Sequence, residues 1–466
     1  MRNISINRHR RYKISVTLSA WTGGTAVFTT SALWPVYSLS SLPIWTQIQL
    51  VQIQWVDTYV FLYDGSEIWS LTITASSWYN FDSVKVNTTT VTSTAITLND
   101  WDEIDVSFIV LDYLCFTANT AGSTVQLKKN GTPAAITLEV SSDKINWSTY
   151  TFDTDIILTN IEDKVYFRNT STTTTGFATS TSNYYQFVMS WSVSWSWDIN
   201  YLLNKNSTTT VSSYCYYCLF YQCTSLTTAP SLPATTLTYY CYWQMFSWCT
   251  SLTTAPVLPA TTLTYGCYFN MFYNCSSLTT APALPATTLA QYCYYQMFYW
   301  CTWLTSTPAL SATTLANYCY YSMFYNCSSL TTAPALPATT LAISCYQNIF
   351  WWCTSITEVP ALPATTLANY CYWGMFAGCT SLTSVPALSA TTLADYCYYR
   401  MFYWCSKIKV SETQTWDYQT EYRIPISWTG TTATSALSSM FSSTGWTFKS
   451  TPTINTTYYT SNTVVS

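Results

Sequence analysis

A repeat of 26 residues, marked by two series of cysteines, constrains this chain more than any other feature. The first series is Cys215, Cys241, Cys267, Cys293, Cys319, Cys345, Cys371 and Cys397, and the second, eight residues later each time, is Cys223, Cys249, Cys275, Cys301, Cys327, Cys353, Cys379 and Cys405. Eight units therefore occupy residues 213–408. Because a unit this short cannot bury its own apolar side chains, neighbouring units must stack into a solenoid.

Within a unit, the pattern is C-Y-Y-x-M-F-Y-x-C-T-S-L-T-T-A-P-A-L-P-A-T-T-L-A-x-Y. In the segment ATTLAQYCYYQMF, Leu289, Cys293 and Met297 are four residues apart, which is the spacing of one helical face and predicts one short helix per unit. After the second cysteine, prolines such as Pro282 and Pro285 exclude a helix and favour short strands and turns. We therefore expect a β-rich stack with a right-handed path and about 4.8 Å per unit.

The cysteines have three possible roles. Metal sites usually pair cysteines as C-x2-C with histidine, whereas the spacing here is C-x7-C and the one histidine, His9, lies outside the repeats. Two cysteines eight residues apart on a helix are ~12 Å apart, too far for a disulfide, although bridges between equivalent cysteines of stacked units stay open. We favour buried, reduced thiols that act as small apolar side chains. The core assigned in this way includes Cys241, Cys249, Cys267, Cys275, Cys293, Cys301, Cys319 and Cys327.

The repeat MFYNCSSLTTAPALPATTLAQYCYY resembles the leucine-rich repeat of BspA-type bacterial surface proteins, which are also found in phage and whose units carry an F-x-x-C-x-x-L core. The resemblance covers residues 213–408, and the unit of 26 residues is longer than is usual in that family. It implies adhesion or recognition at a bacterial or phage surface. It supplies no catalytic residues.

The position before the second cysteine alternates between dissimilar residues, namely Gln222, Trp248, Asn274, Trp300, Asn326, Trp352, Gly378 and Trp404. Glycine and asparagine tolerate a left-handed backbone, so we expect a positive φ along this series and an outward indole at each tryptophan. The chain has 22 Trp and only 11 Gly, although glycine is ordinarily about 7% of residues. We hypothesise that the tryptophans other than Trp147 are glycines encoded by recoded UGA. The alternative is that they are genuine aromatics of a binding face.

The remaining sequence suggests further modules. A basic tail is expected over residues 1–13, where a solvated terminus is favoured over a surface-binding one, and a β-rich module with alternating apolar residues over 14–110. A small β-sandwich is expected over residues 111–190, because AITLEVSSDKINWSTYT resembles the sandwich that often precedes BspA-type repeats. Trp147 is expected to be an aromatic residue of its core. Residues 191–212 are expected to link to and cap the solenoid, and 409–466, including the degenerate unit at SALSSMF, to cap its other end.

Composition argues against several functions. Charged residues make up 8% of the chain and the net charge is -4, which leaves little with which to bind nucleic acid. We find no apolar run of the roughly 18 residues needed to span a membrane, no clear signal peptide and no enzyme fingerprint. The acidic group Asp100, Asp102, Glu103 and Asp105 could ligate calcium, but a solvated turn is favoured. We expect no cofactor, no metal and no catalysis.

One aromatic position varies between units, and we place it on the outside of the solenoid. Its neighbour is tyrosine in every unit, from Tyr216 to Tyr398, and is expected to face inward. The variable series gives the candidate binding residues Tyr217, Trp243, Phe269, Tyr295, Tyr321, Trp373 and Tyr399, which suit a protein or glycan partner. The favoured function is adhesion or recognition outside the cell or at its surface. The alternative is a structural or host-binding protein of a phage tail or fibre, located in the virion.

Overall fold

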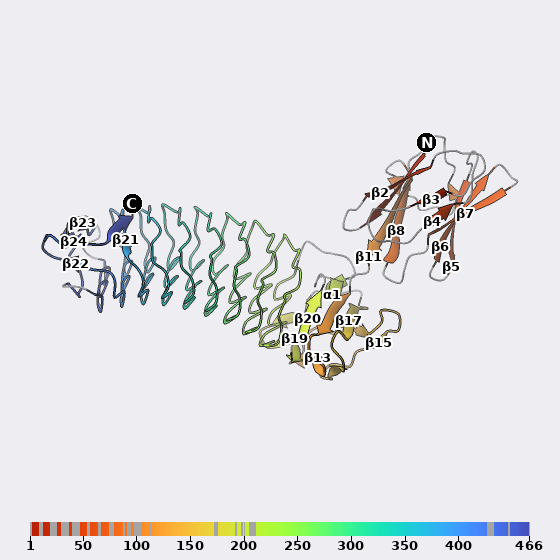
Figure 1. The fold of residues 1–466 in the computed structure, drawn as a ribbon, viewed down its shortest axis with the longest axis horizontal. Coiled ribbons are helices and arrows are strands. Elements are labelled where there is room, and N and C mark those ends of the chain that lie inside the picture. The colour runs from red at the N-terminus through yellow and green to blue at the C-terminus, as the bar shows by residue number, and fades with distance from the viewer. Residues whose placement is uncertain are drawn as a thin grey trace. The chain divides into compact units, whose positions relative to one another are not determined.

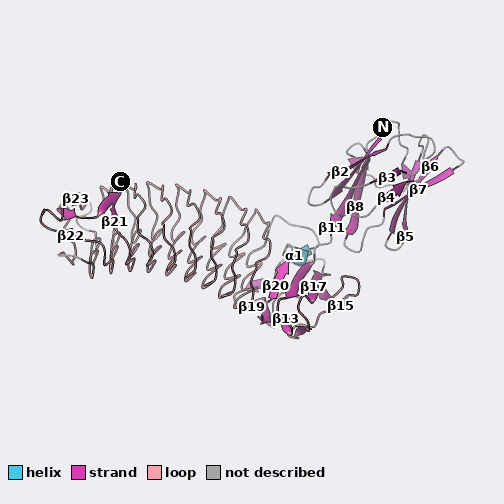
Figure 2. Cartoon of the chain, in the orientation of Figure 1, coloured by secondary structure: helices cyan, strands magenta, loops and turns pink. Residues whose placement is uncertain are grey.

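The computed structural model describes residues 113–171, 176–191, 193–196, 199, 201–204, 211–425, 433–445 and 448–465, together with the strands of residues 2–110. The chain divides into two compact units, Met1–Asp112 and Tyr113–Ser466. Strands dominate, and the only helix among the described residues is the short α1 (Tyr201–Asn204), as Figure 2 shows. The described part of the chain is therefore β-rich with almost no helix.

Two sheets and a hairpin make up the first unit. A five-stranded sheet has the order β2 (Lys13–Leu18), β1 (Arg2–Arg8), β11 (Ile104–Val110), β8 (Tyr79–Val86) and β9 (Thr89–Thr90). A four-stranded sheet has the order β10 (Ala95–Ile96), β5 (Gln47–Ile53), β6 (Val56–Tyr63) and β7 (Glu67–Ile73), and β3 (Ala26–Phe28) pairs with β4 (Tyr37–Leu39).

Strand β1 occupies most of the basic segment 1–13, where we expected a solvated tail. It pairs with β11 in parallel and with β2 in antiparallel fashion, so its backbone groups are bonded within a sheet. The expectation of an unstructured tail is therefore wrong for this segment. Of the acidic group, Asp100, Asp102 and Glu103 lie outside the described residues, and Asp105 lies in β11.

A small sandwich opens the second unit. One sheet has the order β15 (Ser148–Thr149), β14 (Leu138–Ser141), β17 (Lys164–Asn169), β12 (Leu114–Ala118) and β20 (Val193–Ser196). The other has the order β16 (Ile156–Leu158), β13 (Ser123–Asn130), β19 (Asn183–Ser190) and β18 (Ala178–Ser180). Between them Phe116, Phe167 and Phe187 pack with ring centroids 4.9–5.6 Å apart and are buried. Buried residues alternate with more exposed ones along β13 from Ser123 to Leu127, as a strand with one buried face requires.

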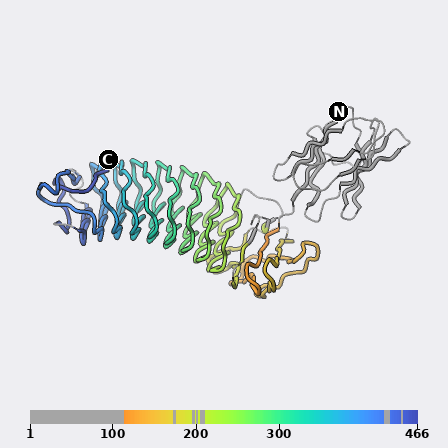
Figure 3. The backbone as a smooth tube through the Cα atoms, viewed as in Figure 1, coloured from red at the N-terminus to blue at the C-terminus, as the bar shows by residue number. Residues whose placement is uncertain are grey.

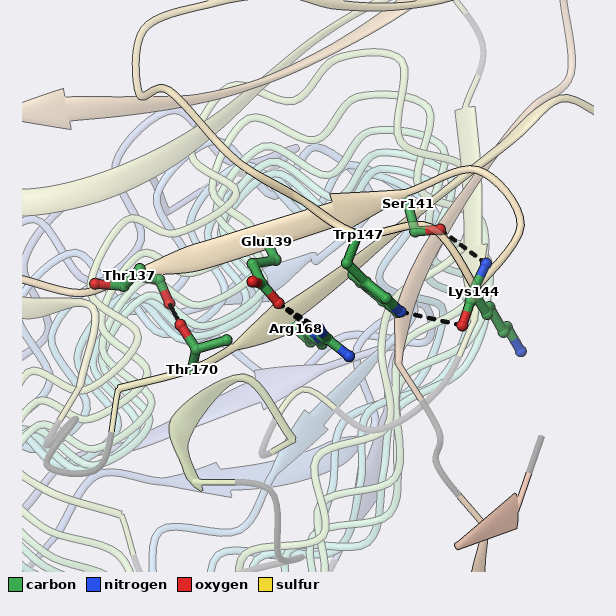
Figure 4. A network of polar contacts seen from close by, with 7 residues as sticks. All are labelled: Thr137, Glu139, Ser141, Lys144, Trp147, Arg168 and Thr170. Carbon is green, nitrogen blue, oxygen red and sulfur yellow. Dashed lines mark hydrogen bonds and ion pairs between the residues drawn. The ribbon is translucent and has the colours of Figure 1, made fainter. Parts of the chain in front are cut away.

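Trp147 does not belong to this sandwich core, so that expectation is wrong. It is half-buried on the outer side of the sheet, where its Nε1 donates to the Lys144 carbonyl at 3.0 Å. The Arg168 guanidinium lies 4.2 Å from the centre of its ring, and Arg168 also pairs with Glu139 on β14 (Figure 4). The indole of Trp147 therefore takes part in a network that joins a hydrogen bond, a cation–π contact and an ion pair.

The eight repeats form coils stacked side by side along one direction, as Figure 1 and Figure 3 show. In each coil, the segment that ends at the second cysteine is a run of turns. The N–H of Tyr217 donates to the Tyr214 carbonyl at 2.9 Å, whereas the N–H of Cys218 donates to Trp243 of the next coil at 3.1 Å. The expectation of one short helix per unit is therefore wrong, because half of the N–H groups in this run bond between coils.

The other half of each coil carries isolated parallel β-bridges. One row pairs Thr228 with Thr254 and Thr254 with Thr280, and a second row begins with Thr236 and Thr262. Every bridge in these two rows joins residues 26 positions apart, so the coils are in register with the sequence repeat, as predicted. Only one short strand, β21 (Ser384–Pro386), extends beyond single bridges among the described coils.

Rows of identical side chains fill the interior of the stack. Tyr216 stacks on Tyr242 at 5.4 Å and Phe220 on Phe246 at 5.6 Å, and both rows continue through all eight coils. The tyrosine series from Tyr216 to Tyr398 is buried, which confirms its expected inward direction. All cysteines of both repeat series are buried and free, and burial raises the pKa of their thiols, to about 12 at Cys267.

The two cysteine series differ in their polar contacts. The Cys249 thiol, in the second series, donates to the Phe220 carbonyl of the preceding coil at 3.0 Å. In the first series, the Cys241 thiol lies 3.9 Å from the Cys267 carbonyl, too far for a strong bond. A thiol of the second series therefore has a carbonyl acceptor at hydrogen-bonding distance. The nearest carbonyl acceptor of Cys241 is farther away and accepts a weaker bond.

Serine substitutions should separate the two series. Cys241→Ser is expected to lower the free energy of unfolding by about 1–3 kcal/mol, because it buries a poorly paired hydroxyl. Cys249→Ser should lower it by clearly less, since its hydroxyl has the Phe220 carbonyl as acceptor. Chemical denaturation of the two variants under reducing conditions measures the difference. Equal losses would contradict this assignment of the thiol contacts.

The sandwich closes the first end of the coil stack. Phe187 of β19 stacks on Phe220 of the first coil at 5.2 Å, its N–H donates to the Leu219 carbonyl at 2.7 Å, and its carbonyl accepts from the Cys223 thiol at 3.0 Å. Strand β19 therefore lies where a preceding coil would lie. The apolar core runs without a break from the sandwich into the repeats.

At the other end, the segment SALSSMF lies where a ninth unit would be. Phe441 stacks on Phe402 at 5.6 Å, and the Tyr398 N–H donates to the Ala436 carbonyl at 2.9 Å. A sheet of β22 (Val410–Ser411), β24 (Thr457–Thr460) and β23 (Thr420–Arg423) follows, and β25 (Thr463–Val465) pairs in parallel with β21. Both ends of the phenylalanine row are thus covered by non-repeating chain.

Candidate functional site

The turn run of each coil sends side chains inward and outward in alternating pairs. In the fourth coil Cys293 and Tyr294 are buried, and the next two residues face outward. Met297 and Phe298 are buried again, and Trp300 in the following pair is 40% exposed. This alternation places several aromatic rows on one outer side of the stack.

The predicted binding column is half-buried rather than freely exposed. Its members Trp243, Phe269, Tyr295, Tyr321, Trp373 and Tyr399 all have intermediate exposure. Tyr217 is buried, because Tyr184 of the sandwich packs against it at 5.2 Å and Trp243 at 5.0 Å. The assignment of Tyr217 to an outward binding face is therefore wrong, and the remaining six form one row along the coils.

A second aromatic row runs beside the first, and our reading of the sequence missed it. Tyr273, Tyr299 and Tyr325 stack with centroids 4.7 and 4.5 Å apart. The variation at this position between Tyr299, Trp351 and Ala377 is the same signal that marked the first row. We call the two rows at the middle coils the tyrosine ladder, which consists of Phe269, Tyr273, Tyr295, Tyr299, Tyr321 and Tyr325.

Ring geometry in the tyrosine ladder decides what it presents to solvent. Tyr295 and Tyr321 are 4.6 Å apart with their planes 4° from parallel, and Tyr299 and Tyr325 are 4.5 Å apart at 9°. Neighbouring rings therefore cover each other's faces and leave edges and hydroxyls for a partner. Burial raises the pKa of Tyr295 and Tyr299, so their hydroxyls are neutral hydrogen-bonding groups.

Along one side of the ladder, the position before the second cysteine has the left-handed backbone that we predicted. Asn274 and Asn326 have φ of 56° and 57°, Gly378 has 76°, and Trp300 has 62°. The tryptophans of this series, Trp248, Trp300, Trp352 and Trp404, all have positive φ and are 37–44% exposed. Both parts of the prediction are confirmed.

Two other positions in each coil share this backbone. Tyr292 has φ of 59° and Gln296 has 49°, so large side chains occupy left-handed positions elsewhere in the same coil. Their N–H groups bond to the next coil, which holds the conformation in place. A positive φ alone therefore does not require glycine before the second cysteine.

Charge is almost absent from the repeats. Between Cys215 and Cys405 the charged residues are Glu358, Asp395 and Arg400. Among the residues that the structure describes, no three histidine, cysteine or acidic side chains are grouped as a metal ion would need. The aromatic side therefore presents hydroxyls, ring edges and one arginine.

Comparison of the chain with protein-family models, with curated proteins and with solved structures finds no match. Within the described part of the chain, no helix has the length and apolar character needed to cross a membrane.

Proposed function

We propose that this chain is a non-enzymatic recognition or adhesion protein displayed outside the cell. In this proposal its stacked coils are a leucine-rich-repeat solenoid of the BspA type, and the aromatic side of the coils binds a protein or glycan. The observation that carries the proposal is the tyrosine ladder, a hydroxyl-bearing aromatic surface on a stack with a continuous apolar core. Tyrosine is enriched where proteins bind partners, because its ring gives contact area at little entropic cost and its hydroxyl finds hydrogen bonds.

The form of the stack supports this use. Each coil bonds to the next through its backbone, as in the bond from Tyr294 N–H to the Cys319 carbonyl at 3.0 Å, so the outward rows are held at fixed spacing. A rigid row lets several weak contacts act together on one extended partner. Outside the run of turns, each coil carries several threonines, and Thr261, Thr287 and Thr313 are exposed there.

A binding experiment with matched variants tests the proposal. The purified chain is applied to a glycan array and to an array of bacterial and host cell-surface proteins. We expect retention on at least one array and its loss when Tyr295, Tyr299, Tyr321 and Tyr325 are all replaced by serine. Replacing Thr261, Thr287 and Thr313 by alanine should leave retention unchanged, and thermal unfolding checks that both variants are folded.

Two results would count against the proposal. Retention that survives the tyrosine substitutions but falls with the threonine substitutions would place the binding side elsewhere on the coils. No retention on either array would argue against adhesion itself.

A further inference from the structure

Arg400 is the only cation between Cys215 and Cys405, and it lies on the aromatic side of the last coil. Its guanidinium carbon is 5.1 Å from the ring centre of Tyr399 and 5.2 Å from that of Tyr403. These rings belong to the same two rows as the tyrosine ladder, because Tyr399 lies five coils after Phe269 and Tyr403 lies four coils after Tyr299. Two aromatic contacts restrict the guanidinium and leave its charge uncompensated.

No acidic side chain of the described residues pairs with Arg400. The nearest in sequence, Asp395, accepts a bond from the Thr434 N–H at 2.6 Å through Oδ1. The Nε of Arg400 is shielded from solvent and has no acceptor in the described part of the chain. A shielded donor without an acceptor is destabilising, and such groups in native proteins commonly serve a function.

In the sandwich of the same chain, another arginine lies against an aromatic ring and also has a carboxylate partner. Arg168 lies over Trp147 at 4.2 Å, and the carboxylate of Glu139 binds its Nε and a terminal nitrogen (Figure 4). Ring and carboxylate together satisfy that guanidinium. Arg400 has the aromatic contacts that Arg168 has, but no carboxylate among the described residues binds it.

We infer that Arg400, held against the rings of Tyr399 and Tyr403, binds a carboxylate of a protein partner, such as an aspartate or glutamate side chain. A guanidinium held against rings presents its nitrogens as a planar fork that matches a carboxylate. Few other charged residues lie in the repeats, namely Glu358, Asp395 and Lys407. Arginine and tyrosine are also the residue types that dominate the centres of protein interfaces.

The geometry favours a protein over an acidic glycan. Sugars bind aromatic side chains through the ring faces, but the faces in this region are covered. Tyr396 stacks on Tyr370 at 5.0 Å, and Trp373 packs against Tyr399 at 5.0 Å. What stays available is a row of hydroxyls and ring edges with one positive charge, which suits the carbonyls and carboxylates of a polypeptide.

The inference rests on the proposed recognition function and names the chemistry of its partner. The test uses the full chain and measures its binding to immobilised poly-L-glutamate. The uncharged derivative poly[N-(2-hydroxyethyl)-L-glutamine] and polygalacturonate are the comparison polymers. Arg400→Gln should weaken binding to poly-L-glutamate at least tenfold, and Arg400→Lys should weaken it less, since it keeps the charge and loses the fork. Lys407→Gln removes the same charge from an exposed position of the same coil and should change binding by less than twofold.

Each other outcome contradicts the inference. Equal losses for Arg400→Gln and Lys407→Gln would mean that only net charge matters. Tighter binding to polygalacturonate than to poly-L-glutamate would assign the site to an acidic glycan. If the chain binds neither polymer but is still retained on the arrays described above, the carboxylate site is wrong and the recognition function stands.

Discussion

Peptide mass spectrometry of the protein from its native source should show the residue mass of glycine at position 300. The same mass is expected at positions 248, 352 and 404. These positions combine a left-handed backbone, φ of 61–65°, with an indole that is 37–44% exposed. A side chain there costs roughly 1–2 kcal/mol per residue relative to glycine. Asn274, Asn326 and Gly378 occupy the same position in other coils and avoid most of that cost.

Trp147 is the internal control, because there a tryptophan mass is expected. Its Nε1 has an acceptor at 3.0 Å, and Arg168 and Tyr113 both pack against its ring. In protein expressed as printed, Trp147→Gly should therefore lower the free energy of unfolding by about 3 kcal/mol. Trp300→Gly should leave it unchanged or raise it, as relief of backbone strain offsets the lost indole contacts. Tryptophan at position 300 in the native protein would reject the recoding hypothesis and make the four indoles genuine members of the aromatic side.

Replacing Phe187 by alanine should destabilise the sandwich and the coils together, by about 3–5 kcal/mol. Phe187 is fully buried and packs against Phe116 and Phe167 of the sandwich and Phe220 of the first coil. Loss of its ring leaves a cavity that both parts line. We expect the tyrosine fluorescence of the coils and the far-ultraviolet signal of the strands to show one transition at a lower denaturant concentration.

The matched control is Ile157→Ala, in strand β16 of the same sandwich. Ile157 is 63% exposed, so its loss should change the free energy of unfolding by less than about 0.5 kcal/mol. Two separate transitions for Phe187→Ala, with the coils unchanged, would show that the sandwich and the repeats fold independently. The continuous core predicts a single transition.

Much of the candidate site followed from reading the repeat by columns. Variation at one position marked the row of Tyr295 and Tyr321 as outward, and that row does lie on the outer side. The neighbouring row of Tyr299 and Tyr325 varies in the same way and was missed. Tyr217 misled us because its column is outward in the middle coils, whereas at the first coil Tyr184 of the sandwich covers it. A column shows the direction of a side chain but not what another domain places against it.

Three features could be predicted from the residues alone, namely the 26-residue register, the identity of the buried rows and the left-handed position before the second cysteine. These follow from local chemistry, since an invariant apolar column must be buried in every unit and glycine with asparagine marks a positive φ. The choice between a helix and a run of turns depended on contacts between coils. A spacing of four residues, as from Leu289 to Cys293, is common to both, and it is the bonds between coils, such as Cys218 N–H to the Trp243 carbonyl, that favour the turns. Backbone groups that pair with a neighbouring unit leave no trace in the side-chain pattern, so no reading of one unit could have found them.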